Sequence, residues 1–239
     1  NQEVKFKLFL ETALENGADM IATGHYARTK DGQLLRAVDG NKDQTYFLYR
    51  VTAAALQKTL FPLGEFTKPE VREMAKQRGL FTAAKKDRQG ICFVGQIGIR
   101  EFLSQYVEQK AGPIIDKQTG DVLGYHDGAI FYTIGQRHGL DVGGGLPYYV
   151  VGKDMDSNTV YVTTNLNDTA LWRPEFTLSQ VHTISGQALQ DGEYEIRVRH
   201  RAPLAEAMVS ADDDGNYSIV PVNAERAVAP GQSVVLYSG

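Results

Sequence analysis

The first part of the chain alternates helical patterns with short apolar runs. Val4 and Leu8 begin an apolar stripe at helical spacing, and Gly17 is placed to end that helix. The run 20–23 is short and apolar and stops at Gly24. Such a run is typical of a buried parallel strand that delivers polar residues at its carboxyl end.

Two more helices are predicted before the pattern changes. Thr67 and Glu70 have the spacing of a capping box, and Pro69 lies in the first turn of the helix that follows. A second apolar stripe predicts a helix over 98–110. Residues 1–110 are therefore expected to form an α/β domain.

From Gly112 onward, short β-rich runs alternate with turn signals, and no helical pattern separates them. The segments 150–153 and 159–163 predict a hairpin. Further strands are predicted over 176–184, 194–200, 206–211, 217–222 and 233–237. The proline-marked segment 172–175 suggests a boundary, so we expect a central β-rich domain over 111–172 and a β-barrel over 173–239.

Composition excludes several classes of protein. With 42% hydrophobic and 23% charged residues, the chain is neither extensively disordered nor collagen-like. Its single cysteine permits no internal disulfide and fits a reducing compartment. No apolar run approaches the roughly 20 residues of a membrane helix, and no export leader is evident. Because the chain begins at Asn1 without methionine, we expect it to be a fragment.

Charge is distributed unevenly along the chain. Residues 1–92 hold 15 Lys and Arg against 11 Asp and Glu, whereas residues 93–239 hold 10 against 18. A polyanionic partner would therefore favour the first part, or local basic clusters in the second.

Cys92 is the most reactive side chain available. It lies between Gly90 and Gly95, close to Lys85, Lys86 and Arg88. Cations lower a thiol pKa and glycines give access, as a nucleophilic or sulfur-carrying thiolate requires. The alternative is a small buried hydrophobic residue between Ile91 and Phe93.

Three other segments carry polar side chains that suit a nucleic acid. His25 follows a predicted strand, where it could contact a ligand or be purely structural. Residues 41–48 begin polar and become apolar, as at the N-terminus of a helix. The polar residues could contact a ligand or could simply cap the helix. Alternation along 197–201 puts Arg197, Arg199 and Arg201 on one face and His200 on the other. The arginine face suits phosphate or is an ordinary solvated strand face.

The glycine-dense segment 134–145 fits no phosphate-loop spacing, and we interpret it as a tight loop. No His, Cys and Asp cluster has zinc spacing, so no metal site is predicted. The sequence also shows no arrangement of Ser, His and Asp that would indicate a catalytic triad.

Taken together and in this order, the motifs resemble the tRNA-specific 2-thiouridylase family. The matching segments cover essentially the whole chain: Asn1-Gln-Glu-Val-Lys-Phe-Lys7, Ala22-Thr-Gly-His-Tyr26, Lys42-Asp-Gln-Thr-Tyr-Phe-Leu48, Phe61-Pro-Leu-Gly64, Gly90-Ile-Cys-Phe93, Thr133-Ile-Gly-Gln-Arg-His-Gly139 and Ala229-Pro-Gly-Gln-Ser233. The resemblance implies the carboxyl-terminal two-thirds of such an enzyme. It places a Ser-Gly-Gly-x-Asp-Ser loop that holds ATP, and a first catalytic cysteine, before Asn1.

The resemblance also implies a fold and a reaction. The fold would be the remnant of a PP-loop ATP-pyrophosphatase α/β domain, a small β-rich domain, and a β-barrel like the second domain of elongation factor Tu. The reaction would use ATP, with Mg, to activate the C2 oxygen of the wobble uridine in the tRNA anticodon stem-loop. Sulfur would arrive as a persulfide on Cys92 from a cysteine desulfurase or relay protein.

Site residues carry over position by position. Cys92 matches the persulfide-bearing cysteine, and Gly24 matches a backbone contact to ATP. The positions that match tRNA contacts are His25, Lys42, Asp43, Gln44, Arg199, His200 and Gln232. The implied tRNAs are those for Lys, Glu and Gln, and the implied location is the cytoplasm, away from membranes.

Two alternatives remain open at this point. One is a non-catalytic RNA-binding module in which Cys92 only packs. The other is a different ATP-pyrophosphatase relative, such as an amide-forming ligase. Without the ATP loop, the chain as it stands is expected to be inactive.

Overall fold

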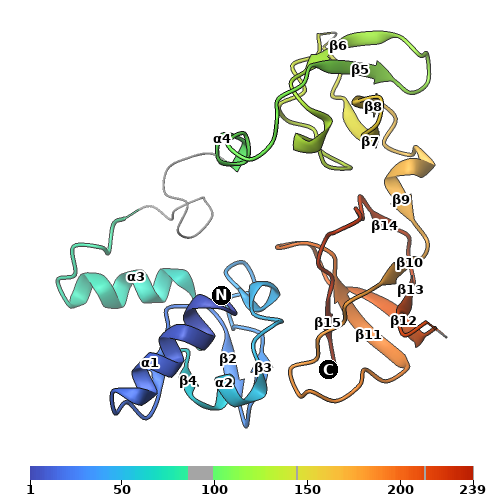
Figure 1. Ribbon diagram of the computed structural model, residues 1–239. Helices are drawn as coiled ribbons and strands as arrows, with labels where there is room; N and C mark the ends of the chain where they lie inside the picture. The colour runs from blue at the N-terminus through green and yellow to red at the C-terminus, as the bar shows by residue number, and fades with distance from the viewer. Residues whose placement is uncertain (86–98, 144, 213, 239) are drawn as a thin grey trace. The chain divides into compact units, whose positions relative to one another are not determined.

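The computed structural model describes residues 1–85, 99–143, 145–212 and 214–238. The described residues form two compact units (Figure 1). The first unit combines residues 1–85 with 175–223 and 233–238, and the second combines residues 99–174 with 224–232. The expected domain boundaries at 110/111 and 172/173 remain predictions.

The α/β part of the first unit begins with a helix that ends as expected. This helix runs as a π-type segment η1 (Val4–Phe9) followed by α1 (Leu10–Glu15). It ends at Asn16, and Gly17 follows with a φ of 86°. That left-handed conformation favours glycine, so the predicted end of the helix is confirmed.

The predicted parallel strand is also confirmed. Strand β1 (Ile21–Ala22) pairs in parallel with β4 (Thr59–Leu60). Beside them lie the hairpin β2 (Arg28–Lys30) and β3 (Gln33–Leu35), the short 3-10 turn η2 (Thr45–Phe47) and helix α2 (Ala53–Gln57) (Figure 1). The parallel pair places Gly24 and His25 just beyond the carboxyl end of β1.

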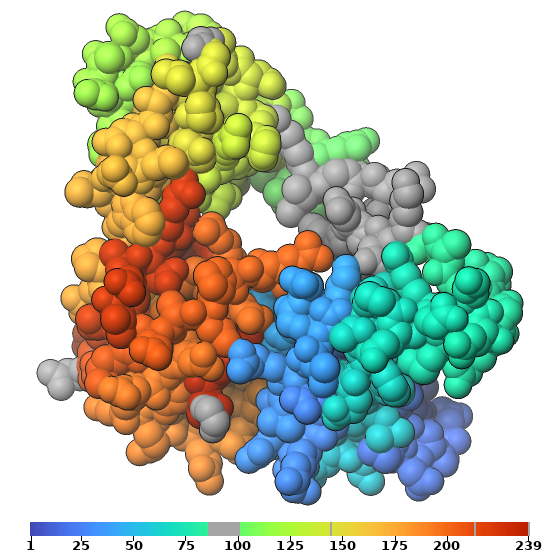
Figure 2. Space-filling model, turned by 180° about the vertical axis from the view of Figure 1, so that it is seen from behind, coloured from blue at the N-terminus to red at the C-terminus, as the bar shows by residue number. Residues whose placement is uncertain are grey.

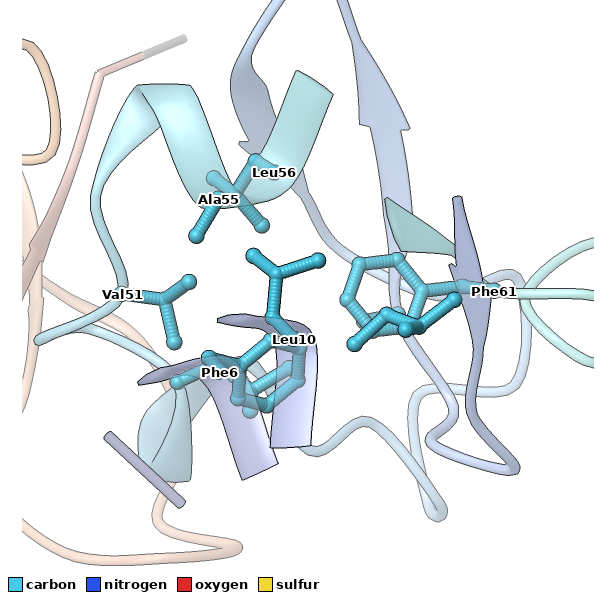
Figure 3. Packing of buried hydrophobic residues seen from close by; sticks show 9 residues of the cluster. Phe6, Leu10, Val51, Ala55, Leu56 and Phe61 are labelled. Carbon is cyan, nitrogen blue, oxygen red and sulfur yellow. The ribbon is translucent and has the colours of Figure 1, made fainter. Parts of the chain in front are cut away.

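One hydrophobic cluster holds these elements together. In Figure 3, Leu10 lies between Phe61 and the α2 residues Ala55 and Leu56. Leu48 and Leu56 are both completely buried. The helix η1–α1 packs on this cluster through Phe6 and Leu10. The stripe expected to begin with Val4 and Leu8 is wrong for these two residues, which are 51% and 58% exposed.

The Phe61–Gly64 motif has a steric role in this packing. A Cβ atom at Gly64 would collide with the backbone carbonyl of Ala27. Gly64 also accepts a hydrogen bond from the Val38 N–H at 3.0 Å. Only glycine allows these two backbone segments to approach each other this closely.

Helix α3 (Lys68–Gln77) begins as its capping box predicts. The Glu70 carboxylate accepts hydrogen bonds from the Thr67 N–H and hydroxyl, both at 2.7 Å. Helix α4 (Ile99–Leu103) is shorter than the expected 98–110. Beyond it, the Ser104 hydroxyl donates to the Glu101 carbonyl, and the chain continues as turns.

The second unit is a β-rich body, as expected. Its sheet has the order β6–β5–β8–β7, formed by β5 (Gly112–Asp116), β6 (Val122–His126), β7 (Tyr149–Asp154) and β8 (Thr159–Thr163). Strands β7 and β8 form the predicted hairpin. The unit also contains the 3-10 turns η3 (Ala129–Phe131) and η4 (Thr169–Leu171), and the pair β9 (Trp172–Arg173) and β14 (Glu225–Arg226).

The first residues of the glycine-dense segment are hydrogen-bonded to a strand of the second unit. The Gly135 N–H donates to the Val150 carbonyl at 2.7 Å, and the Val150 N–H donates to the Gln136 carbonyl at 3.0 Å. These bonds tie the loop to β7. This part of the motif therefore has a structural use.

An antiparallel sheet completes the first unit. Its strand order is β10–β13–β12–β11–β15, seen in orange and red in Figure 1. The strands are β10 (Phe176–Leu178), β11 (Gly192–Arg197), β12 (Ala205–Ala211), β13 (Tyr217–Pro221) and β15 (Val235–Tyr237). All five fall inside or beside the predicted runs, but the strand predicted over 194–200 ends at Arg197.

Two leucines close together in the sequence provide a test of the α/β core. Leu56 is completely buried, whereas Leu60 is 49% exposed. Leu56→Ala is expected to lower the free energy of unfolding by about 2–5 kcal/mol, because it removes buried methyl groups and leaves a cavity. Leu60→Ala is expected to change it much less. Urea unfolding of both variants measures the difference, and equal losses would contradict the packing described.

Candidate functional site

Gly24 presents exposed backbone just beyond β1. A Cβ atom at this position would meet only Leu63 Cδ1, at 3.9 Å. The preceding Thr23 N–H donates to the Leu60 carbonyl at 3.0 Å, which continues the β1–β4 ladder up to the glycine. Open backbone at the carboxyl end of a parallel strand fits a bound nucleotide.

His25 is buried within the α/β part, only 8% exposed. Its Nδ1 lies 2.9 Å from the Thr23 hydroxyl, and its Nε2 lies 3.4 Å from the Lys5 ammonium. Because an ammonium group can only donate, Nε2 is the acceptor and Nδ1–H donates to Thr23. Its ring also packs edge-on against Phe61, with 6.3 Å between centroids.

The environment of His25 keeps its imidazole neutral. Burial, followed by the positive charge of Lys5, lowers its pKa from 6.5 to about 4. At neutral pH, His25 therefore offers a hydrogen-bonding ring rather than a cation.

The Lys42–Asp43–Gln44 segment is held mainly by internal contacts. Asp43 is only 2% exposed, and one of its carboxylate oxygens lies 2.9 Å from Arg197 Nη1. The same oxygen accepts a hydrogen bond from the Thr45 hydroxyl at 2.8 Å. The other accepts one from the Ala37 N–H at 3.1 Å. The carboxylate therefore faces the protein interior.

Gln44 and Lys42 flank that carboxylate. The Gln44 side-chain oxygen accepts from the Tyr26 N–H, and the Gln44 N–H donates to the Tyr26 carbonyl, both at 2.9 Å. Lys42 is half-buried, and its N–H donates to the Asp39 carbonyl at 3.0 Å. Contacts of these three residues with RNA remain predictions.

The residues that follow join the α/β part to the antiparallel sheet. The Tyr46 hydroxyl donates to the Ser233 carbonyl at 2.8 Å. Tyr49 and Ser233 share a hydroxyl contact at 2.8 Å, and Thr45 and Tyr237 share one at 3.1 Å. We call this set of contacts, with the Asp43–Arg197 pair, the seam. In Figure 2 the orange sheet surface meets the blue α/β surface within this unit.

The expected basic face around residue 199 needs correction. Because β11 ends at Arg197, Arg197, Arg199 and Arg201 do not share one strand face. Arg197 is buried, 8% exposed, and paired with Asp43, whereas Arg199 and Arg201 are exposed on the turn that follows. Two of the three arginines thus remain available to phosphate.

His200 lies on this turn against an aromatic side chain of η2. Its ring centroid is 4.5 Å from that of Phe47. Burial, then the charges of Arg201 and Arg197, lower the pKa of His200, with Asp43 acting in the opposite direction. Within the part of the chain described, its Nδ1 has no hydrogen-bond partner.

The other predicted site residues lie elsewhere or outside the described chain. Gln232 belongs to the second unit, where it is half-buried and its N–H donates to the Ala229 carbonyl at 3.2 Å. Cys92 lies outside the described residues. Over the described ranges, no cluster of three or more His, Cys, Asp and Glu could hold a metal. No described helix is long and apolar enough to cross a membrane.

Sequence reasoning missed two residues of this region. Arg197 is expected on a basic face because alternation places it opposite its apolar neighbours Ile196 and Val198, and no local signal indicates its burial. Phe47 was included in a motif but was given no role, and no pattern in the sequence relates it to His200, about 150 residues away. The contacts of Arg197 with Asp43 and of Phe47 with His200 become visible only in the three-dimensional structure.

The Asp43–Arg197 pair is expected to dominate the stability of the seam. Asp43→Ala would leave the buried Arg197 guanidinium unpaired, at a cost of about 3–5 kcal/mol in free energy of unfolding. Glu195→Ala is the matched control, because its ion pair with Arg36 spans 3.8 Å between half-exposed side chains. That change is expected to stay within about 1 kcal/mol. Urea unfolding followed by circular dichroism compares the two, and similar losses would contradict the assignment.

The lowered pKa of His25 gives a pH prediction. Between its folded value of about 4 and its unfolded value of 6.5, the unfolded chain binds the proton more readily. The stabilising contribution of neutral His25 is therefore complete above pH 6.5 and is lost as the pH falls toward 4. An NMR titration of the His25 ring, assigned by loss of its signal in His25→Gln, is expected to give a midpoint near 4. A midpoint near 6.5 would refute the burial of a neutral ring.

Comparisons with known proteins cover nearly the whole chain. Residues 1–96 match the model of the tRNA methyl transferase HUP domain, residues 100–164 match the tRNA methyl transferase PRC-barrel domain, and residues 173–239 match the aminomethyltransferase beta-barrel domain. These matches confirm the expected fold class: a nucleotide-binding-type α/β part, a β-rich middle domain and a C-terminal β-barrel.

Relatives named tRNA-specific 2-thiouridylase MnmA align with every part of the chain. Those of Bacillus thuringiensis (strain Al Hakam), Bacillus anthracis and Bacillus cytotoxicus are each 45% identical over 246 aligned positions, covering 100% of this chain. The chain spans 66% of the length of each relative, corresponding to its C-terminal part. The chain belongs to the tRNA-specific 2-thiouridylase family.

Proposed function

We propose that the protein takes part in 2-thiouridine synthesis, in which Cys92 carries a persulfide whose sulfur is transferred to C2 of the wobble uridine of tRNA. The observation that carries this proposal is 45% identity, along the whole chain, to proteins named tRNA-specific 2-thiouridylase. Because the chain spans 66% of those relatives, the activity is proposed for the full-length protein.

Cys92 has the sequence surroundings that a sulfur carrier needs. Lys85, Lys86 and Arg88 precede it closely, and positive charge stabilises a thiolate or a persulfide anion. In one route, the terminal sulfur of its persulfide attacks C2 and displaces AMP; a second cysteine then attacks Cys92 Sγ, breaks the S–S bond to the nucleotide and forms a disulfide with Cys92. In the other, the second cysteine attacks the persulfide first, and the released hydrosulfide attacks C2 and displaces AMP. The sulfur would be supplied by a cysteine desulfurase or a relay protein.

The α/β part is proposed to hold the nucleotide. The C2 carbonyl carbon of uridine is a poor electrophile; ATP, with Mg, would adenylate the carbonyl oxygen, releasing pyrophosphate and making AMP the leaving group. The exposed Gly24 backbone offers N–H and C=O groups to such a ligand without a side chain in the way. The HUP-domain match over residues 1–96 supports this role.

The RNA partner is proposed to be the anticodon stem-loop of tRNAs for Lys, Glu and Gln, in the cytoplasm. Exposed Arg199 and half-buried Lys42 and His200 supply cationic or ring surfaces suited to phosphate and bases. Asp43 would act by holding Arg197 in place, because its own carboxylate is buried. The remaining proposed contacts are His25, Gln44 and Gln232.

A substitution at Cys92 tests the proposal. In full-length protein, Cys92→Ser is expected to abolish 2-thiouridine, because a serine hydroxyl cannot carry the transferable sulfur. Nucleoside mass spectrometry of tRNA from cells whose only copy is the variant measures the product. Labelling of the purified protein after incubation with a cysteine desulfurase measures persulfide on Cys92.

Binding separates loss of chemistry from loss of fold. Cys92→Ser is expected to bind tRNA with the wild-type Kd and to melt at the wild-type temperature. Undiminished 2-thiouridine would remove Cys92 from the mechanism. Salt-dependent tRNA binding by a wild-type protein that forms no 2-thiouridine would favour the non-catalytic RNA-binding module instead.

A further inference from the structure

Phe47 is exposed although it lies in a buried segment. Its side chain is 45% exposed, whereas Thr45 is 2% exposed and Leu48 is completely buried. Phe47 therefore presents a partly exposed aromatic face on a segment that is anchored by buried neighbours.

A second ring extends the Phe47 surface. The His200 centroid is 4.5 Å from the Phe47 centroid, with 43° between the ring planes. The Tyr46 ring centroid lies 5.5 Å from that of Phe47 and 6.3 Å from that of His200. The rings of Phe47 and His200, which we call the ring pair, come from segments about 150 residues apart in the sequence.

The seam holds both members of the ring pair in place. On one side, the Tyr46 hydroxyl is bonded to the carbonyls of Ser233 and Val198, at 2.8 and 3.4 Å. On the other, the buried Asp43–Arg197 pair fixes the end of β11, three residues before His200. The rings are thus positioned before any ligand arrives, which reduces the entropy lost on binding.

Charge around the ring pair favours a polyanion. Arg199 and Arg201 flank His200 and are both exposed. The lowered pKa of His200 leaves its ring neutral at neutral pH, so it can present an aromatic face while the arginines supply the positive charge. Aromatic faces next to arginines suit unpaired nucleotides, whose bases stack and whose phosphates pair with guanidinium groups.

We propose that the ring pair of Phe47 and His200 stacks on an unpaired base of the bound RNA, with Arg199 and Arg201 contacting the adjacent phosphates. The inference rests on the proposed function, because it assumes that tRNA is the ligand. It adds Phe47, to which the proposed function gives no role, as an RNA-binding residue.

Substitutions at Phe47 in full-length protein test the stacking. Stacking contributes about 1–3 kcal/mol per base, which converts to about 5- to 150-fold in Kd. Phe47→Ala and Phe47→Leu are both expected to weaken tRNA binding within that range, because leucine keeps apolar bulk but lacks a ring. Phe47→Tyr is expected to bind within twofold of wild type. Fluorescence anisotropy with an unmodified tRNA transcript, at fixed salt, gives each Kd.

The matched control is Phe81→Ala, since Phe81 is 95% exposed elsewhere in the first unit. It is expected to leave the Kd unchanged. Phe47→Ala is also expected to keep the wild-type salt dependence, whereas Arg199→Gln lowers the slope of log Kd against log salt by about one. Thermal melts of all variants verify folding.

The outcomes separate this inference from the proposed function. If Phe47→Ala or Phe47→Leu binds like wild type, while the wild-type protein binds and thiolates tRNA, stacking is overturned and the proposed function stands. Stacking is also overturned, and the proposed function stands, if the Phe47 variants bind tRNA normally but accept less sulfur from a desulfurase. In that case the ring pair would be a docking site for the sulfur-donating protein. If the full-length wild-type protein forms no 2-thiouridine, the proposed function itself is refuted.

Discussion

The buried ion pair between Asp43 and Arg197 is the contact on which the first unit depends. It joins two segments that are far apart in the sequence, and its atoms are only 2.9 Å apart. Burial of an unpaired charge has a large unfavourable desolvation free energy, so each of these two side chains needs the other in order to be buried. Thr45 and the Ala37 N–H complete the coordination of the carboxylate. The Arg197 guanidinium also lies 5.4 Å above the Tyr237 ring, which adds a cation–π contact.

The segment from Lys42 to Leu48 therefore has two faces with different uses. Its inward side chains, Asp43, Thr45 and Leu48, are buried in the seam or the core. Its outward side chain, Phe47, is exposed beside the turn after β11. The rigid inner face fixes the position of the outer one. Under the proposed function, Asp43 and Thr45 would serve RNA binding by holding this segment in position and not by touching the RNA.

Much of the fold could be predicted from local signals. The glycine after α1, the capping box of α3 and the β7–β8 hairpin depend on short-range geometry, so neighbouring residues were enough to predict them. The alternation rule failed at β11, because a buried ion pair made Arg197 an inward residue and the strand ended there. The candidate site depended on long-range partners. Asp43 with Arg197, and Phe47 with His200, are about 150 residues apart, and nothing local in the sequence relates them.

Strand β15 has a consequence for the order in which the protein is made. It pairs with β11, and Ser233 and Tyr237 receive the hydroxyl contacts of Tyr49 and Thr45. Ribosomes synthesise these residues nearly two hundred positions after the α/β elements that need them. The nascent α/β part must therefore wait with Asp43 unpaired until β11 and then β15 emerge. High contact order of this kind slows folding and leaves apolar surface open to chaperones during translation.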